Sequence, residues 1–522
     1  MPDDYRRRRT LVGLSALTIL ALLISLVVDR MGDDDGDGSG ERAVESGEQV
    51  DDEETTDAGE ADAEEEEEDG DSFTTDFEGL ADPDGFGRPY PNAKYPGLLT
   101  FRGNPSRSYY GEGPVPTTAP TIRHKFPDEP MCRSSLNLGE TKVWCGMGWT
   151  GQPTIVERED RTWAIFGGYD GHIHFMDAST GERILPDVVT DDIIKGTPTI
   201  DPDGFPLVYS GSRDNYIRVI AFDRPGQAEV LWKLHAEEIG PTLWNDDWDS
   251  SPIIIDDYMI VGSESSRFWV IKLNRTTDAA GLVQVAPEIT FSTEAWDQEV
   301  LNANGDNKAS VESSVAVYED IVYFGTTAGL ILGYDLGSLG EGGTPERVFR
   351  FFTGGDNDAS VVTDDEGMLY IASQYDRDLD RAREVGQLTK VDPSVPGGRI
   401  VWKVDDQGGF GGGLYGTPAV VGDMVYAGTN GGRLMGIDRA TGAIRWTKQF
   451  ELPLWGSPVV VDDVLLMGDC SGFFHAWDVS DTAIDPPQLW QLELGGCIEA
   501  TPAVWKGQIY IGTRGGHLFV IG

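Results

Sequence analysis

Basic residues are scarce in this chain. Its 522 residues include 40 lysines and arginines against 89 aspartates and glutamates, for a formal net charge of −49. Residues 1–32 carry +2 and residues 33–82 carry −23, which leaves −28 on residues 83–522. Such an acidic surface repels nucleic acid and anionic lipid, so we expect no nucleic-acid partner. The charge can keep the protein soluble, and it can attract cations or basic partners.

Long uncharged stretches are also rare, and the one at Leu11–Val28 is 18 residues long. As a helix it would span about 27 Å, close to the thickness of a bilayer core. Residues 1–10 form a basic tip with Arg6 to Arg9, which favours a cytoplasmic N-terminus and an extracytoplasmic C-terminus. The alternative is a cleaved signal peptide, but Leu26 to Arg30 contains no small-x-small cleavage site. We therefore expect an uncleaved single-pass transmembrane helix.

Apolar residues are nearly absent from the next segment, residues 29–82, which includes the run Glu64 to Glu68. Without apolar side chains to bury, this segment is expected to be a disordered acidic tether, extended by self-repulsion. A lead-in segment, residues 83–117, follows it. The remaining residues, 118–522, form the predicted folded domain.

Helix signals are missing from one stretch that is representative of the folded domain, and short strands take their place. The stretch Thr417–Trp446 reads as four strands separated by turns. Asn430-Gly431-Gly432 is a strong hairpin signal because these residues tolerate a positive φ. The stretch has no capped segment with a 3.6-residue period.

The same unit recurs along the domain. Eight segments begin with a similar dipeptide, near Gln152-Pro153, Thr197-Pro198, Ser251-Pro252, Ser314-Val315, Ser360-Val361, Thr417-Pro418, Ser457-Pro458 and Thr501-Pro502. Four strands repeated every 40–60 residues or so predict a β-propeller of eight four-stranded blades. The eighth copy ends at Gly522 after three strands, so we expect Thr121–Phe126 to supply its outer strand and close the ring.

These residues carry a family resemblance. The repeat resembles the pyrroloquinoline-quinone (PQQ)-like, or quinoprotein-like, repeat across about residues 118–522, most clearly in residues 417–446 and 501–522. Proteins with this repeat include quinoprotein alcohol dehydrogenases and the propeller lipoprotein of the outer-membrane assembly machine. The resemblance implies an all-β, eight-bladed, quinoprotein alcohol dehydrogenase-like propeller. WD-type repeats match less well, because Trp477-Asp478 is the one WD pair at the end of a third strand, and it lacks the spaced Gly-His.

The loop that enters each blade is expected to line the mouth of a central funnel. Three residues before the proline of each repeat start, or before the residue in its place, the sequence has Thr150, Lys195, Asp249, Glu312, Asp358, Tyr415, Trp455 and Glu499. Two long insertions, residues 292–309 and 375–385, fall on the same face. In quinoproteins such loops supply calcium ligands, a catalytic aspartate and aromatic planes around the quinone. The resemblance thus implies Asp249 and Glu312 as metal ligands and Asp358 as the catalytic residue, whereas a purely solvated acidic funnel is the alternative.

Cysteine is limited to four residues: Cys132, Cys145, Cys470 and Cys497. In an extracytoplasmic domain they suggest two disulfides, for which three connectivities are possible. We expect the short-range pairs, Cys132 with Cys145 and Cys470 with Cys497. A cross-pair is the alternative, because Cys497 and the 132–145 loop enter neighbouring blades. Quinoprotein alcohol dehydrogenases often carry two adjacent cysteines in the site, and this chain has no adjacent pair.

Other catalytic patterns are weak or missing. No G-x-S-x-G nucleophile elbow occurs. His172 and His174 share a strand face, but a third metal ligand is not identifiable from the sequence. Gly411-x-Gly413-x-x-Gly416 precedes a strand instead of a helix, which indicates a loop and not a dinucleotide site.

Two functions remain open on the sequence. The first is a membrane-anchored, extracytoplasmic propeller that acts as a binding or scaffold module, with a protein partner or small ligand at the funnel face and envelope-protein assembly as one setting. The alternative is a dehydrogenase that uses PQQ and calcium to oxidise alcohols or sugars. The fold does not choose between them.

Overall fold

The computed structural model describes residues 85–137, 140–149, 151–408 and 411–522. The expected anchor at Leu11–Val28 and the expected tether at residues 29–82 lie outside these ranges. Within them, no helix has the length and hydropathy to cross a bilayer. The chain divides into two units, and the larger, Asp71–Arg133 with Val143–Gly522, contains the propeller. The smaller unit, Met1–Gly70 with Ser134–Lys142, includes the tip of a two-stranded hairpin, β4 (Cys132–Asn137) and β5 (Glu140–Cys145).

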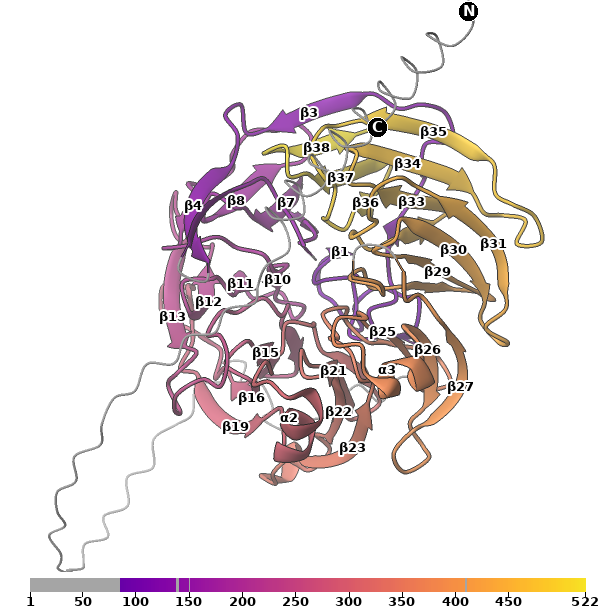
Figure 1. Ribbon diagram of the computed structural model, residues 1–522. Helices are drawn as coiled ribbons and strands as arrows, with labels where there is room; N and C mark the ends of the chain where they lie inside the picture. The colour runs from indigo at the N-terminus through magenta and orange to yellow at the C-terminus, as the bar shows by residue number, and fades with distance from the viewer. Residues whose placement is uncertain (1–84, 138–139, 150, 409–410) are drawn as a thin grey trace, which may run out of the picture. The chain divides into compact units, whose positions relative to one another are not determined.

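The larger unit confirms the predicted ring of eight blades (Figure 1), whose strands pair antiparallel except for β2, which pairs parallel with β36 in blade eight. Blade one contains β1 (Gly97–Leu98), β6 (Thr154–Arg158), β7 (Arg161–Gly167), β8 (His172–Asp177) and β9 (Val188–Val189). Blade two contains β10 (Thr199–Ile200), β11 (Leu207–Ser210), β12 (Tyr216–Ala221) and β13 (Glu229–His235). Blade three contains β14 (Ile253–Ile255), β15 (Tyr258–Ser263), β16 (Arg267–Lys272) and β19 (Glu288–Glu294). Blade four contains β20 (Ala316–Tyr318), β21 (Ile321–Gly325), β22 (Leu330–Asp335) and β23 (Glu346–Phe352).

The second half of the ring repeats the pattern. Blade five contains β24 (Val362–Thr363), β25 (Leu369–Ala372), β26 (Leu388–Asp392) and β27 (Arg399–Val404). Blade six contains β28 (Ala419–Val421), β29 (Met424–Gly428), β30 (Arg433–Asp438) and β31 (Ile444–Gln449). Blade seven contains β32 (Val459–Val461), β33 (Val464–Gly468), β34 (Phe473–Asp478) and β35 (Gln488–Glu493). Blade eight contains β36 (Ala503–Trp505), β37 (Gln508–Gly512) and β38 (Leu518–Ile521), with β2 (Gly111–Glu112) and β3 (Ile122–Phe126).

The ring closes as the sequence predicts. Strand β3 pairs antiparallel with β38, so a strand from before the first repeat completes the last blade. This pairing covers the sheet edge that blade eight would otherwise expose.

A belt of hydrogen bonds explains why the repeats begin with serine or threonine. In six consecutive blade junctions, the backbone N–H of one repeat start donates to the hydroxyl of the next, at 2.9–3.0 Å. The chain of donors and acceptors runs from Gln152 through Thr197, Ser251, Ser314, Ser360 and Thr417 to Ser457. Each hydroxyl satisfies a buried backbone donor of its neighbour, which ties adjacent blades together at the inner strands.

Two tryptophans of the outer strands are buried against backbone. Trp402 is buried, and its Nε1 donates to the carbonyl oxygen of Arg439 in the next blade at 2.9 Å. Trp446 is buried over Gly436 of its own blade, where an added Cβ would lie 2.2 Å from the indole. The absence of a side chain at Gly436 therefore lets the Trp446 ring lie directly on the backbone.

Residues 85–117, expected as a lead-in, belong to the ring. They supply β1 to blade one and β2 to blade eight. Between these strands, Arg102 and Arg107 are fully buried and donate to backbone carbonyls of several blades. Tyr110 accepts at its hydroxyl from Val420 N at 2.8 Å. This segment therefore fills the middle of the ring, and we call residues 97–112 the plug.

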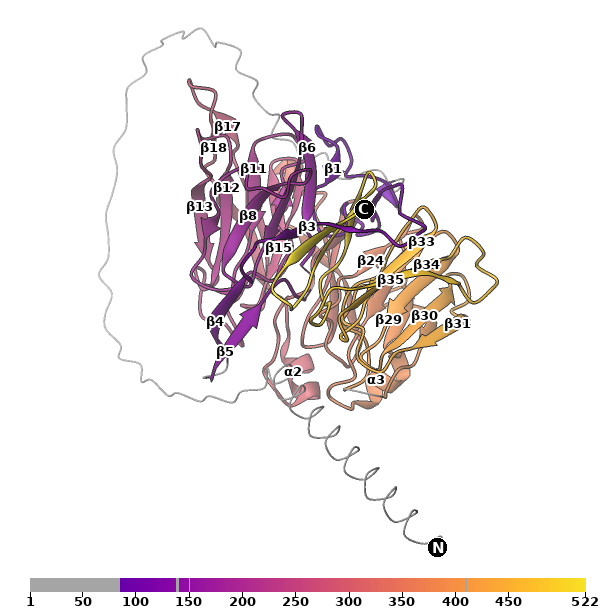
Figure 2. The same ribbon diagram turned by 90° about the horizontal axis from the view of Figure 1, so that it is seen from above.

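The insertions and cysteines complete the described fold. Helix α2 (Gln298–Asn304) lies in the insertion before blade four and α3 (Asp380–Val385) in the insertion of blade five. Figure 2 shows both helices on one face of the ring, away from the hairpin of β17 (Thr276–Thr277) and β18 (Val283–Gln284). A 3₁₀ turn, Leu339–Glu341, precedes β23. Both expected disulfides are confirmed, Cys132 with Cys145 and Cys470 with Cys497.

Candidate functional site

Three carboxylates converge at the entry to blades three and four. Asp249 precedes β14, Glu264 follows β15 and Glu312 precedes β20, and each offers an oxygen within 4.8 Å of the others. Asp249 and Glu264 are 3% and 2% exposed. We call these residues the acidic trio. The sequence predicted two of its members. It missed Glu264, which lies in the turn between β15 and β16.

Lys195 inserts a positive charge into the acidic trio. Its Nζ lies 2.7 Å from Asp249 Oδ2 and 3.8 Å from Glu264 Oε1. The same ammonium lies 5.5 Å from the centre of the Trp149 ring. Burial alone would lower the pKa of Lys195, but Asp249 and Glu264 outweigh it and hold that pKa well above its usual value. Lys195 is therefore a permanent cation at this site.

The negative charge of the trio still exceeds what Lys195 supplies. Burial, then the repulsion from Glu312 and Asp249, raises the pKa of Glu264 well above its usual value. Burial also raises the pKa of neighbouring Asp247, which pairs with Arg213 at 3.1 Å. A protonated Glu264 would reduce the repulsion that remains.

A second carboxyl group of the mouth, at the entry to blade five, lies in different surroundings. Asp358 is 4% exposed, and its Oδ2 accepts a short hydrogen bond from Gln374 Nε2. Among the described residues, no hydrogen-bond donor reaches its Oδ1. Burial, then Asp356 and Glu312, raises the pKa of Asp358 well above its usual value. Burial and Asp376 raise the pKa of Asp356 to about 7.

The mouth contains three neighbouring aromatic rings, those of Trp149, Tyr415 and Trp455. The centre of the Tyr415 ring lies 5.9 Å from that of Trp149 and 5.8 Å from that of Trp455, both edge to face. Burial, then Asp358, raises the pKa of Tyr415 well above its usual value, so its hydroxyl stays protonated. In the described part of the chain, the indole N–H groups of Trp149 and Trp455 have no acceptor.

Glu499 lies in a separate ion pair. Arg514 Nη1 lies 3.2 Å from both of its carboxylate oxygens. The Arg514 guanidinium in turn lies over the rings of Trp144 and Tyr169, at 4.8 and 4.9 Å. Of the predicted mouth residues, Thr150 lies outside the described ranges. Lys195, Asp249, Asp358 and Glu499 are all 5% exposed or less, which is far more buried than a solvated funnel would require.

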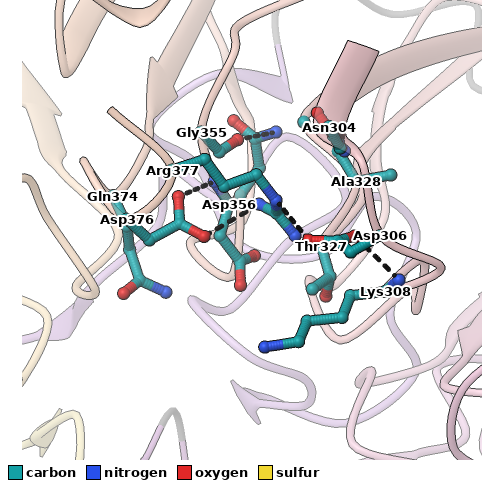
Figure 3. Close-up of polar contacts among 12 residues, drawn as sticks. Asn304, Asp306, Lys308, Thr327, Ala328, Gly355, Asp356, Gln374, Asp376 and Arg377 are labelled. Atoms are coloured by element: carbon teal, nitrogen blue, oxygen red, sulfur yellow. Dashed lines mark hydrogen bonds and ion pairs between the residues drawn. The ribbon is translucent and has the colours of Figure 1, made fainter. Parts of the chain in front are cut away.

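The two insertions meet beside this mouth (Figure 3). Arg377 Nε lies 3.1 Å from Asp306 Oδ2, and its Nη1 lies 2.8 Å from Asp376 Oδ2. Asp376 also accepts from Asp356 N at 3.1 Å. The network therefore connects the segment after α2, the segment before α3 and the loop that carries Asp358. Sequence reasoning identified the insertions but not Arg377.

The plug forms the floor beneath the mouth. Arg107 donates to the carbonyl oxygens of Ser251 at 3.1 Å and Val315 at 2.7 Å. Arg102 donates to Pro418 at 2.9 Å and Pro458 at 3.1 Å. Burial lowers the pKa of Arg107 to about 9. These acceptors lie at the repeat starts, two to three residues beyond the mouth positions. Two buried guanidinium groups thus underlie the acidic mouth.

The residue types match calcium better than quinone. Carboxylate oxygens are the ligands that calcium prefers, and Asp249 Oδ1 has no hydrogen-bond partner among the described residues. However, the Lys195 ammonium already lies among these oxygens. Trp149, Tyr415 and Trp455 meet edge to face, at interplanar angles of 84° and 79°. They do not form the parallel walls that would enclose a planar quinone.

The histidines that the sequence singled out lie elsewhere, in blade one. His174 is buried between two aspartates, with its Nε2 3.2 Å from Asp170 Oδ2 and its Nδ1 3.1 Å from Asp187 Oδ1. His172 lies 3.2 Å from Asp170. Among the described residues, only the acidic trio has the spacing of a metal site, so these side chains form an ion-pair cluster.

Sequence comparisons find partial matches. The model of the family described as outer membrane protein assembly factor BamB matches residues 384–522. Quinoprotein alcohol dehydrogenase PedE of Pseudomonas putida is 32% identical over 89 residues, which cover 16% of this chain and 14% of that protein. The match thus spans about one seventh of the relative's length.

Structural comparisons extend over more of the chain. Quinohemoprotein alcohol dehydrogenase from Comamonas testosteroni is similar with a TM-score of 0.55 and 11% identity, over 82% of this chain and 80% of that one. Sqt1 from Saccharomyces cerevisiae has a TM-score of 0.53 and 10% identity, over 77% and 99% of the two chains. The chain is therefore an eight-bladed propeller whose fold is similar to that of the quinohemoprotein alcohol dehydrogenase, and its residues 384–522 match the family model described as outer membrane protein assembly factor BamB.

Proposed function

We propose that this chain is a membrane-anchored, extracytoplasmic propeller that acts as a protein-binding or scaffold module in envelope-protein assembly. The observation that carries this proposal is the position of Lys195. Its ammonium lies 2.7 Å from Asp249 and 3.8 Å from Glu264, where a calcium-dependent enzyme would need those oxygens for its metal. A site that already contains its own cation depends less on a metal for stability.

Further observations support a binding role. The plug fills the middle of the ring with two arginines, which limits the depth available to a cofactor. The family match to an assembly factor covers residues 384–522. The two disulfides favour an oxidising, extracytoplasmic compartment. The anchor rests on the sequence of Leu11–Val28, and mass spectrometry of the mature N-terminus tests it, since a start after residue 28 would contradict it.

A photo-crosslinking experiment in intact cells tests the binding role. A photoreactive amino acid at Trp455, which is partly exposed at the mouth, should give a discrete crosslinked protein of reproducible mass. The matched control is Val348 on the outer strand β23, which is 51% exposed and remote from the repeat starts. Equal crosslinking from both positions, or none from Trp455, would argue against a partner at this face.

The alternative function is a dehydrogenase that uses PQQ and calcium. The spacing of the acidic trio and the partnerless Asp249 Oδ1 favour it, as does the PedE match. In that case Asp249, Glu264 and Glu312 would hold the calcium, Lys195 would have to leave them, and Asp358 would be the catalytic candidate.

A thermal and kinetic assay separates the two functions. The full chain is incubated with saturating calcium and PQQ, and its melting temperature and its oxidation of alcohols and sugars with an artificial electron acceptor are measured. We expect no shift and no turnover. A calcium- and quinone-dependent shift together with turnover would overturn the scaffold proposal.

A further inference from the structure

The mouth contains two buried aspartates, Asp249 and Asp358, whose neighbours at the equivalent position differ in charge. Asp249 and Asp358 occupy equivalent positions, each in the loop that enters its blade. Beside Asp249, the equivalent position of the preceding blade is Lys195, whose ammonium neutralises it at 2.7 Å. Beside Asp358, the equivalent position of the preceding blade is Glu312. Asp358 thus meets a like charge where Asp249 meets an opposite one.

The surroundings of Asp358 do not replace the missing cation. Its hydrogen-bond donor is the neutral amide of Gln374. Other cations of the mouth form ion pairs with other carboxylates: Arg377 with Asp306 and Asp376, Arg213 with Asp247, and Lys195 with Asp249 and Glu264. Arg377 and Lys308 also lie close enough to Asp356 to offset part of the rise that burial and Asp376 give its pKa. Within the described ranges, no lysine or arginine nitrogen forms an ion pair with Asp358, and its Oδ1 lacks a donor although the side chain is 4% exposed.

Two carboxyl groups in a buried site cannot both ionise without a compensating charge. Asp356 and Asp358 interact directly: after burial, Asp356 is the largest cause that raises the pKa of Asp358, whereas burial and Asp376 raise the pKa of Asp356. Either a proton or an external cation must therefore be present. At Asp249, the negative charge is compensated by the primary ammonium of Lys195, which is held by the carboxylate and covered by the Trp149 ring.

An aromatic ring is available at the second site as well. Tyr415 occupies the entry to the blade after Asp358 and is in contact with Trp455 at 5.8 Å between ring centres. Both rings are partly exposed, so the edge of the site is open to solvent. A carboxylate beside an aromatic ring is the combination that selects ammonium and guanidinium groups.

We propose that Asp358, with Asp356 and the Tyr415 ring, binds the positively charged side chain of a lysine or arginine on a partner protein, in the way that Asp249 and the Trp149 ring hold Lys195. This site rests on the proposed binding function and specifies the partner's chemistry. The partner inserts a basic side chain into the mouth and supplies the charge that blade four does not. Binding displaces a proton from the Asp356/Asp358 pair and is therefore tighter at higher pH.

A peptide titration on the full chain tests this site. The probe is a capped five-residue alanine–serine peptide with lysine in the middle, and the reference peptide carries norleucine at that position. Calorimetry at about 50 mM and about 200 mM salt measures both affinities, since a charge-dependent complex weakens as screening increases. We expect the lysine peptide to bind, the norleucine peptide to bind at least about tenfold more weakly, and affinity to rise between pH 6 and pH 8 or so.

Two variants test whether the lysine peptide binds at Asp358, and a third serves as the control. Asp358→Asn and Tyr415→Leu should each weaken the lysine peptide at least about tenfold. The matched control is Asp335→Asn, in a separate acidic cluster with Asp320 and Glu346 that has no aromatic lining residue. Its affinity should equal that of the wild type. Circular dichroism confirms that each variant is folded, and Asp358→Asn retains the shape of the protonated side chain.

The outcomes are separable from those of the function assay. Equal binding of the two peptides, or unchanged binding by Asp358→Asn, would overturn the ammonium site. Calcium binding that Asp358→Asn abolishes, without peptide binding, would assign the residue to a metal and also overturn it. If the peptides fail and quinone-dependent turnover is absent, the scaffold function stands without this site. If turnover appears, the scaffold function itself fails.

Discussion

Arg377 of the blade-five insertion and Asp306 of the blade-four insertion are joined by an ion pair of 3.1 Å. The Arg377 side chain is 7% exposed, whereas Asp306 is 31% exposed. One guanidinium therefore fixes two insertions that are about 70 residues apart in sequence beside the mouth. Its position makes it the first target for mutagenesis.

Replacing Arg377 with methionine should destabilise the fold by about 1–3 kcal/mol, because it leaves Asp306 and Asp376 without their cation in a mostly buried network. Chemical denaturation measures the loss. A double-mutant cycle with Asp306→Asn should give a favourable coupling energy. The control is Arg383→Met on α3, whose ion pair with Asp380 is exposed and should contribute little. Similar effects of the two arginine substitutions would contradict the structural role of Arg377.

Lys195→Met should create a calcium site. The substitution leaves Asp249 and Glu264 buried without their cation, which should cost about 3–5 kcal/mol at neutral pH in the absence of metal. Calcium should then raise the melting temperature of the variant but not of the wild type, because the trio's oxygens become available to it. Scanning calorimetry with and without calcium measures both. A variant indifferent to calcium would show that the trio does not need a cation.

Three truncations should separate the plug from ring closure. Deletion of residues 1–82 should leave a folded domain, since it keeps both. Deletion of residues 1–117 keeps β3 but removes the plug, and loses the hydrogen bonds that Arg102 and Arg107 make to five backbone carbonyls of the blades. Each buried carbonyl left without a donor costs about 1–3 kcal/mol, so this protein should melt well below the first. Deletion of residues 1–130 also removes β3 and should aggregate through the exposed edge of β38. Equal melting temperatures of the three truncated proteins would contradict both the role of the plug and the closure of the ring by β3.

The buried His174 should make stability fall as pH rises. Burial acts to lower its pKa, but the contacts with Asp170 and Asp187 outweigh this and raise the pKa above its unfolded value of about 6.5. The folded state thus binds the proton more tightly than the unfolded state, so this contribution is complete below about pH 6.5 and disappears as pH rises through the folded-state pKa. His174→Gln should therefore lose more stability at pH 5.5 or so than at pH 9 or so. Urea unfolding at both values measures this, with the more exposed His235→Gln as control. An equal loss at both values would show that His174 does not bind an extra proton in the folded state.

The architecture could be predicted from the repeat pattern. The Ser/Thr-Pro repeat starts, the glycine turns and the strand ending at Phe126 predicted eight blades and the closure by β3, because a repeated unit with one apolar pattern must pack each copy against the next in the same way. The short-range disulfides, Cys132 with Cys145 and Cys470 with Cys497, were predicted as well. The repeat register also identified Lys195, Asp249 and Asp358 as mouth residues, since equivalent positions in a ring lie at equivalent depths.

The pairing of charges could not be predicted in the same way, because it depends on how the blades pack. Different loops supply Lys195, Asp249 and Glu264. Which of these side chains form ion pairs depends on the directions in which they point, and no local sequence pattern encodes those directions. The plug could not be predicted from the sequence either. Arg102 and Arg107 donate hydrogen bonds to backbone carbonyl oxygens, and a residue of any type can supply such an acceptor. The hydroxyl belt has the same origin: Ser251 and Thr417 are needed for a neighbour's N–H, and that requirement exists only when the blades stand side by side.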